Sequence, residues 1–162
     1  MPIRASDSSW QHSEKEKANI FACHLSLVFK PNPPTSGFEI PATINNSIQE
    51  ISPITITRGE VNNIISKELN PRKSPGYDLI TPKMIKELPS IAVVFLMQLF
   101  NAFLRIGHFP SVWKKSLIIM ISKPGKDKTL PSSYRPISLL PCLSKMFEKL
   151  SLLKLSEHLS NN

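Results

Sequence analysis

The segment KPGKDKTLPSSYRPISLL, residues 123–140, carries the residue types best suited to holding phosphate groups. Three lysines, Lys123 and Lys126 among them, precede Arg135. Arginine offers a planar fork that binds phosphate oxygens in pairs, whereas lysine acts as a mobile point charge. The segment therefore predicts a grip on a triphosphate or a nucleic-acid backbone. A solvated hairpin tip with Arg135 paired to an acid explains the same residues equally well.

Two β-prone runs are predicted to position these cations. SLIIMIS, residues 116–122, is apolar and β-branched, and we expect a strand buried on both faces. SYRPISLL, residues 133–140, is the expected hairpin partner, in which Pro136 restricts the strand to an edge or a bulge. Because strand residues are held more rigidly than loop tips, Arg135 would be aimed while the loop closes over a ligand.

Helices are predicted wherever a start signal precedes an apolar stripe. Ser13 with Glu16, and Thr57 with Glu60, form capping-box patterns. Gly107 suits a left-handed helix C-cap. The predicted helices begin after Ser13, after Thr57, at Pro82 behind the capping residue Thr81, at Pro89 and near Pro141. The expected fold class is α+β, mainly helical with a basic β-hairpin. Residues 1–30 would form a helical extension, residues 31–54 a Pro-rich linker and residues 55–162 the main domain.

The charge of this 162-residue chain, +8 in total, is unevenly distributed. Residues 1–66 hold five Lys/Arg and six acids, whereas residues 67–162 hold fifteen Lys/Arg and six acids. This asymmetry favours a polyanion as partner, most often nucleic acid. A surface that is charged only for solvation is the alternative.

Disulfide, zinc and membrane functions are disfavoured. Cys23 and Cys142 are far apart and lack metal-ligand spacing, so we expect reduced, buried thiols. The longest apolar run, residues 91–104, contains Gln98 and Asn101 and is short for a membrane span. No membrane association is expected.

Trp113, followed by two lysines, has two interpretations. It stacks on a base or on a template backbone, or it anchors the preceding helix to the hairpin. We favour the anchor, because aromatic side chains more often fill cores. His108 is expected to pack or cap at a helix end.

Several of these runs together resemble a known family. KSPGYDLITPKMIKELP and FLRIGHFPSVWKKSLIIMISKPGKDKTLPSSYRPISLLPCLSKMFEKL are similar to the N-terminal part of the reverse transcriptase of non-LTR retrotransposons, in the jockey-like group. The resemblance covers about residues 55–155, with a looser match at residues 15–35. It implies that residues 55–162 are an incomplete fingers subdomain of a right-hand polymerase, without the catalytic palm.

The resemblance also implies roles for single residues. Arg135 would grip the triphosphate of the incoming nucleotide, assisted by Lys123 and less firmly by Lys126. The implied template or nucleic-acid contacts are Lys73, Gly76, Lys114, Lys115 and Tyr134. Two positions depart from the family. Leu79 stands where the family usually has Gly, which strains the turn if that position needs a positive φ, and Lys154 stands where the family usually has Arg.

No catalytic residue and no metal ligand is predicted in this chain. Two-metal phosphoryl transfer needs paired carboxylates, and the three aspartates, Asp7, Asp78 and Asp127, are isolated from one another. Mg²⁺ and deoxynucleotides would belong to the full-length enzyme, with none bound by this chain alone. RNA template and DNA primer are the implied partners, and no obligate protein partner is inferred. An intracellular location, in the nucleus, the cytoplasm or both, is expected rather than secretion.

The leading interpretation is a polymerase fragment that is inactive alone and has apolar faces left exposed. The alternatives are a non-catalytic basic nucleic-acid-binding module and a truncated relic without function.

Overall fold

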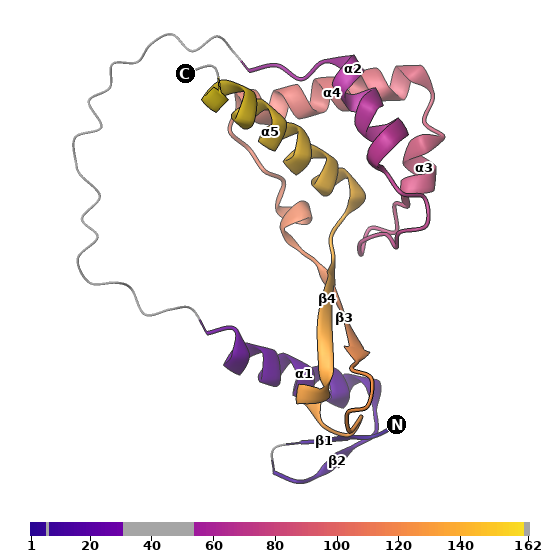
Figure 1. Ribbon diagram of the computed structural model, residues 1–162, viewed down its shortest axis with the longest axis vertical. Helices are drawn as coiled ribbons and strands as arrows, with labels where there is room; N and C mark the ends of the chain where they lie inside the picture. Colours follow the sequence, from indigo (N-terminus) through magenta and orange to yellow (C-terminus); the bar gives the residue numbers. More distant parts are fainter. Residues whose placement is uncertain (6, 31–53, 161–162) are drawn as a thin grey trace, which may run out of the picture. The chain divides into compact units, whose positions relative to one another are not determined.

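Figure 1 shows the computed structural model, which describes residues 1–5, 7–30 and 54–160. The predicted Pro-rich linker lies outside the described residues except for its last position. The described chain forms two compact units. We call residues 1–5, 7–30 and 119–137 the hairpin unit, and residues 54–118 and 138–160 the helical unit. The boundaries of these units differ from those of the ranges predicted from the sequence, 1–30, 31–54 and 55–162. The functions predicted for those ranges stay predictions.

The hairpin unit begins with a small ladder that the sequence did not suggest. Strands β1 (Ile3–Arg4) and β2 (Trp10–Gln11) pair antiparallel, with Ile3 opposite Gln11. The connecting turn is held by Asp7, whose Oδ1 accepts from the backbone N–H and the hydroxyl of Ser9. Strands of two residues carry no hydrophobic alternation, which explains why they escaped prediction.

Helix α1 (Glu14–Val28) follows the ladder and begins as predicted. The Ser13 hydroxyl accepts from the Glu16 N–H, and the Glu16 carboxylate accepts from the Ser13 N–H, so the capping box is complete.

Strands β3 (Leu117–Ser122) and β4 (Tyr134–Leu139) form the predicted hairpin, with a 3₁₀ turn, η3 (Pro131–Ser133), before β4. Pro136 is accommodated because each strand of a two-stranded sheet has a free edge. The expected burial of the first strand on both faces is wrong. Leu117, Ile118 and Ile121 are 46 to 48% exposed. An apolar run indicates a strand but cannot reveal that the sheet lacks further strands to cover it.

The helical unit contains α2 (Arg58–Asn63), η1 (Ile64–Glu68), α3 (Pro82–Lys86), α4 (Ser90–Arg105), η2 (Ser111–Lys114) and α5 (Cys142–Ser160). The capping box of Thr57 with Glu60, the Thr81 cap and the start of α4 after Pro89 are confirmed. Gly107 has a φ of 61°, as a left-handed C-cap requires. The predicted helix after Thr57 continues through a π-helical turn, η1.

The core cluster of buried side chains lies within the helical unit. Phe100 of α4, Val61 of α2 and Leu150 of α5 are fully buried. Asn101, the polar residue inside the apolar α4 sequence, has a structural role. Its side-chain oxygen accepts from the Ile56 N–H at 2.7 Å, and its amide donates to the Ile56 carbonyl at 2.8 Å. Asn101 thereby fastens the chain before α2 to α4.

The described chain fits the predicted α+β class, since helices predominate beside two two-stranded sheets. In residues 1–5, 7–30 and 54–160, no helix combines the length and the apolar character that crossing a membrane requires.

Candidate nucleic-acid interface

The hairpin displays its cations in two ways. Arg135 of β4 and Lys126 of the connecting loop are exposed. Lys123 is half-buried, and its ammonium donates to the Ser132 carbonyl at 2.8 Å. Lys123 therefore helps to hold the two ends of the loop together, while Arg135 presents its donors to solvent. In the described ranges, the ion pairs involve lysines and none involves Arg135.

Tyr134 is held by its own unit. Its hydroxyl donates to the Lys128 carbonyl at 2.8 Å, and its ring meets Phe21 of α1 edge-on, with ring centroids 4.9 Å apart. These contacts fix the strand immediately before Arg135. The predicted nucleic-acid contact of Tyr134 stays a prediction, and the structure supplies a packing role beside it.

Asp127 shapes the loop that carries the lysines. Its Oδ1 accepts from both the N–H and the hydroxyl of Thr129, at 2.9 and 2.7 Å. The Thr129 backbone hydrogen bond is the main cause that lowers the pKa of Asp127. This carboxylate is thus engaged in an Asx-type turn.

The turn that contains Lys73 and Gly76 packs closely against the start of α5. A Cβ on Gly76 would lie 2.5 Å from the Pro141 nitrogen and 2.7 Å from the Leu140 carbonyl carbon. The neighbouring Tyr77 donates its hydroxyl to the Val112 carbonyl. Gly76 is therefore required by close backbone approach, whereas Lys73 is exposed. The template contacts predicted for Lys73 and Gly76 stay predictions.

Trp113 is a core residue. Its ring lies 5.5 Å from Phe103 and 6.1 Å from Phe100 of α4, and 5.9 Å from Phe147 of α5. With 9% of its surface exposed, it has no face to offer a base. The interpretation of Trp113 as a core residue is confirmed, but the predicted partner, the hairpin, is wrong, because these rings belong to α4 and α5. Lys114 and Lys115, directly after it, are exposed.

The described residues do not fit a catalytic metal ion. They contain no group of three or more His, Cys, Asp or Glu side chains that could hold one. Asp78 and Asp127 instead accept turn hydrogen bonds, Asp78 from the Ile80 N–H at 3.3 Å. We derive no metal-dependent step for these residues.

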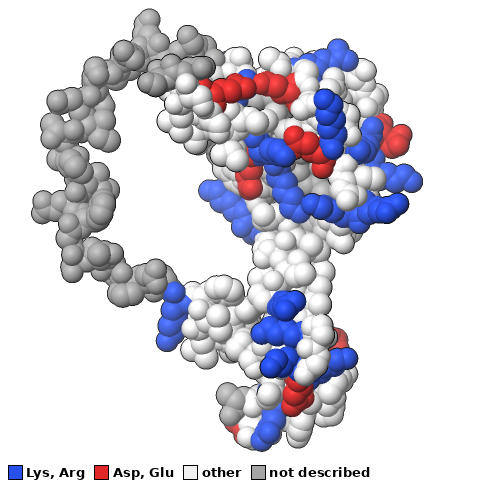
Figure 2. All heavy atoms as spheres, in the orientation of Figure 1, with Lys and Arg blue, Asp and Glu red and all other residues white. Residues whose placement is uncertain are grey.

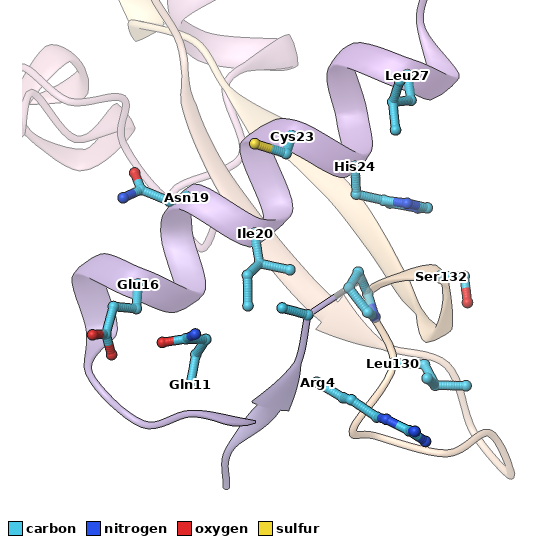
Figure 3. Close-up of a pocket in the computed structure, with 12 residues that line it drawn as sticks. Arg4, Gln11, Glu16, Asn19, Ile20, Cys23, His24, Leu27, Leu130 and Ser132 are labelled. Carbon is cyan, nitrogen blue, oxygen red and sulfur yellow. The ribbon is translucent and has the colours of Figure 1, made fainter. Parts of the chain in front are cut away.

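A cavity of about 700 Å³ lies in the hairpin unit, between α1 and the Leu130–Ser132 segment (Figure 3). Three of its polar side chains already have partners in the chain. Arg4 donates to Ser8, Gln11 donates to Ser9, and Glu16 belongs to the α1 capping box. Asn19, His24 and Ser132 also line the cavity.

One cationic group of the helical unit was missed by sequence reasoning. Lys145 and Lys149, one turn apart on α5, line the same small groove as Lys73. The i, i+4 spacing in SKMFEKL was visible in the sequence, but the meeting of α5 with a turn about seventy residues earlier was not.

Sequence comparison shows that the chain is similar to known proteins. The chain is 39% identical over 153 residues to a probable RNA-directed DNA polymerase from transposon X-element of Drosophila melanogaster, an alignment covering 92% of the chain and 17% of that protein. It is 39% identical over 154 residues to the RNA-directed DNA polymerase from mobile element jockey of Drosophila funebris, covering 93% and 17%. No protein-family model matches.

These relatives are RNA-directed DNA polymerases, and the chain aligns with one part of each. By this similarity it belongs to the jockey-like family of non-LTR retrotransposon proteins, as the resemblance indicated. It spans about a sixth of the length of the relatives it matches, 17% in both alignments above.

Proposed function

We propose that the chain contributes the fingers of an RNA-directed DNA polymerase and grips the incoming nucleotide and the template there. The observation that carries this proposal is the exposed Arg135 on a hairpin strand, in a chain of jockey-like ancestry. Tyr134 and Lys123 fix the backbone on either side of the loop, so Arg135 projects from an ordered strand. A guanidinium is a planar, preorganised fork and binds phosphate oxygens in pairs at a small entropic cost.

RNA template and DNA primer are the partners of this proposal, and Mg²⁺ and deoxynucleotides are ligands of the whole polymerase. The described residues hold no carboxylate group suited to the metal ions. Polymerisation then requires carboxylates from outside these residues, and the chain alone does not extend a primer. We also propose an intracellular site of action, in the nucleus or the cytoplasm.

A chimera tests the proposal directly. The segment of a jockey polymerase that aligns with this chain is replaced by this chain, and primer extension is measured. We expect extension to persist. Arg135→Ala should raise KM for deoxynucleotides about tenfold or more, because a desolvated arginine–phosphate contact contributes 1.5–3 kcal/mol, while primer–template affinity changes little. Arg58→Ala, which removes an exposed arginine from α2, is the control and should leave KM unchanged.

The same chimera distinguishes the fingers proposal from a rival function, a non-catalytic nucleic-acid-binding module. The many exposed cations favour this rival. A module of that kind binds primer–template but does not restore extension. A folded chimera that binds without extending, or one in which Arg135→Ala and Arg58→Ala behave alike, overturns the fingers proposal.

A further inference from the structure

A groove of about 200 Å³ lies in the helical unit, lined by residues of η1, of the segment after it and of α5. Its floor is apolar, with Leu69, Pro82 and Met146 among the lining residues. Its rim is cationic, because Lys73 comes from the turn, and Lys145 and Lys149 come from α5. Figure 2 shows Lys and Arg side chains gathered on one face of this unit.

The three lysines differ in their partners. Lys149 forms an ion pair with Glu68, the one acid that lines the groove. Lys73 and Lys145 are exposed, and in the described parts of the chain neither forms an ion pair. The groove thus keeps two uncompensated cations on facing elements. Such an arrangement attracts a phosphate chain from both sides.

Burial is the main cause that raises the pKa of the Cys142 thiol; the Lys145 ammonium acts in the opposite direction, and the Asp78 carboxylate acts in the same direction as burial. Cys142 and Lys145 both line the groove. The Cys142 side chain itself is 3% exposed and stays a neutral part of the floor.

We propose that this groove holds the phosphate backbone of a single RNA strand, with Lys73 and Lys145 as the contacting cations. The groove is too small for a duplex, and its floor carries no aromatic ring for base stacking, so binding should not depend on base sequence. The inference rests on the proposed function and extends its template path along α5, to residues that no family motif assigned.

Salt titrations of RNA binding test the groove. The full chain is titrated onto a fluorescein-labelled single-stranded RNA, and anisotropy gives the affinity between about 50 and 200 mM salt. Lys73→Ala and Lys145→Ala should each reduce the slope of log K against log salt by about 0.7, and the double variant by about 1.4. Glu68→Gln, which releases Lys149, should steepen the slope and tighten binding. A gain of this kind cannot arise from misfolding.

Lys15→Ala, an exposed lysine of α1 outside the groove, is the matched control, and circular dichroism confirms that each variant is folded. The groove is overturned if Lys145→Ala and Lys15→Ala give the same slope, or if Glu68→Gln changes nothing. In that outcome a raised KM of the Arg135→Ala chimera leaves the proposed function intact. If the Lys73, Lys145 and Glu68 variants change the salt slope as expected but the chimera does not extend a primer, the groove proposal stands and the proposed polymerase function is overturned.

Discussion

Leu79 is one of the two positions that depart from the family pattern, and its backbone conformation carries an energetic cost. Its φ of 60° lies in the left-handed region, and its side chain is 73% exposed. A left-handed conformation costs a residue with a Cβ about 1–2 kcal/mol, whereas glycine adopts it freely. The sequence predicted a strained turn on the condition that position 79 has a positive φ. The structure confirms that the φ of Leu79 is positive.

Leu79→Gly should therefore stabilise the helical unit. Relief of about 1–2 kcal/mol exceeds the 0.4–1 kcal/mol by which glycine favours the unfolded chain, for a net gain of roughly 0.5–1 kcal/mol. Urea unfolding followed by circular dichroism measures the gain. Leu155→Gly, at a 52% exposed leucine within α5, is the control and should lose about 1 kcal/mol. Equal losses in both variants would show that the turn at Leu79 is unstrained.

At the scale of elements, a cluster of ion pairs connects α5 to α2 within the helical unit. Lys154 of α5 pairs with Glu60 in the first turn of α2 and, at 3.1 Å, with Glu157. Burial alone would raise the pKa of Glu60, but the hydrogen bonds from Lys154 and Thr57 together outweigh it and lower that pKa. The hydrogen bond to Glu60 is the main cause that raises the pKa of Lys154.

These shifts fix the pH range in which the pair stabilises the fold. Glu60 contributes stability above its ordinary pKa of 4.5 and loses it as the pH falls through its lower folded pKa. Lys154 contributes below its ordinary 10.5 and loses it as the pH rises through its higher folded pKa. Near neutral pH both contributions are complete.

Lys154→Met should lower the free energy of unfolding by about 1 kcal/mol at pH 7 and reduce the loss of stability on acidification. The variant keeps the aliphatic contacts of the side chain and removes its charge. Lys17→Met provides the comparison, because Lys17 pairs with the 92% exposed Glu14 and should change stability little. Denaturant unfolding at pH 7 and near pH 4 measures both. An acid limb unchanged in Lys154→Met would contradict the pairing.

Elements whose signals are local were predictable from the sequence, and their surroundings were not. The capping residues Ser13 and Thr57 are followed three positions later by their glutamates, so short-range chemistry placed both helix starts. The hairpin was likewise visible in its two apolar runs. The need for glycine at position 76 arises from the approach of the Leu140 and Pro141 backbone, and Trp113 packs on rings of α4 and α5. No local pattern encodes these contacts.

At the scale of the whole molecule, buried apolar surface is concentrated in one unit. The core cluster belongs to the helical unit, and helix α1 of the hairpin unit has no buried residue. Ile3 is the one buried hydrophobic side chain in the described hairpin unit. The helical unit also exposes apolar side chains outside its core, including Ile91 and Phe95 on α4. Such exposure is expected for a segment of a larger polymerase.

This distribution predicts unequal protection in hydrogen exchange. Amides of α4 and α5 should exchange through global unfolding of the helical unit, while those of α1 and β4 exchange through cheaper local opening, since few buried contacts oppose it. Phe100→Ala removes a fully buried ring and should weaken protection in α4 and α5 by about 3–5 kcal/mol without changing α1. Phe95→Ala, on the exposed side of the same helix, should leave both units unchanged. Mass spectrometry of peptides from each unit measures this, and a parallel loss of protection in α1 and α5 would mean that the two units unfold as one.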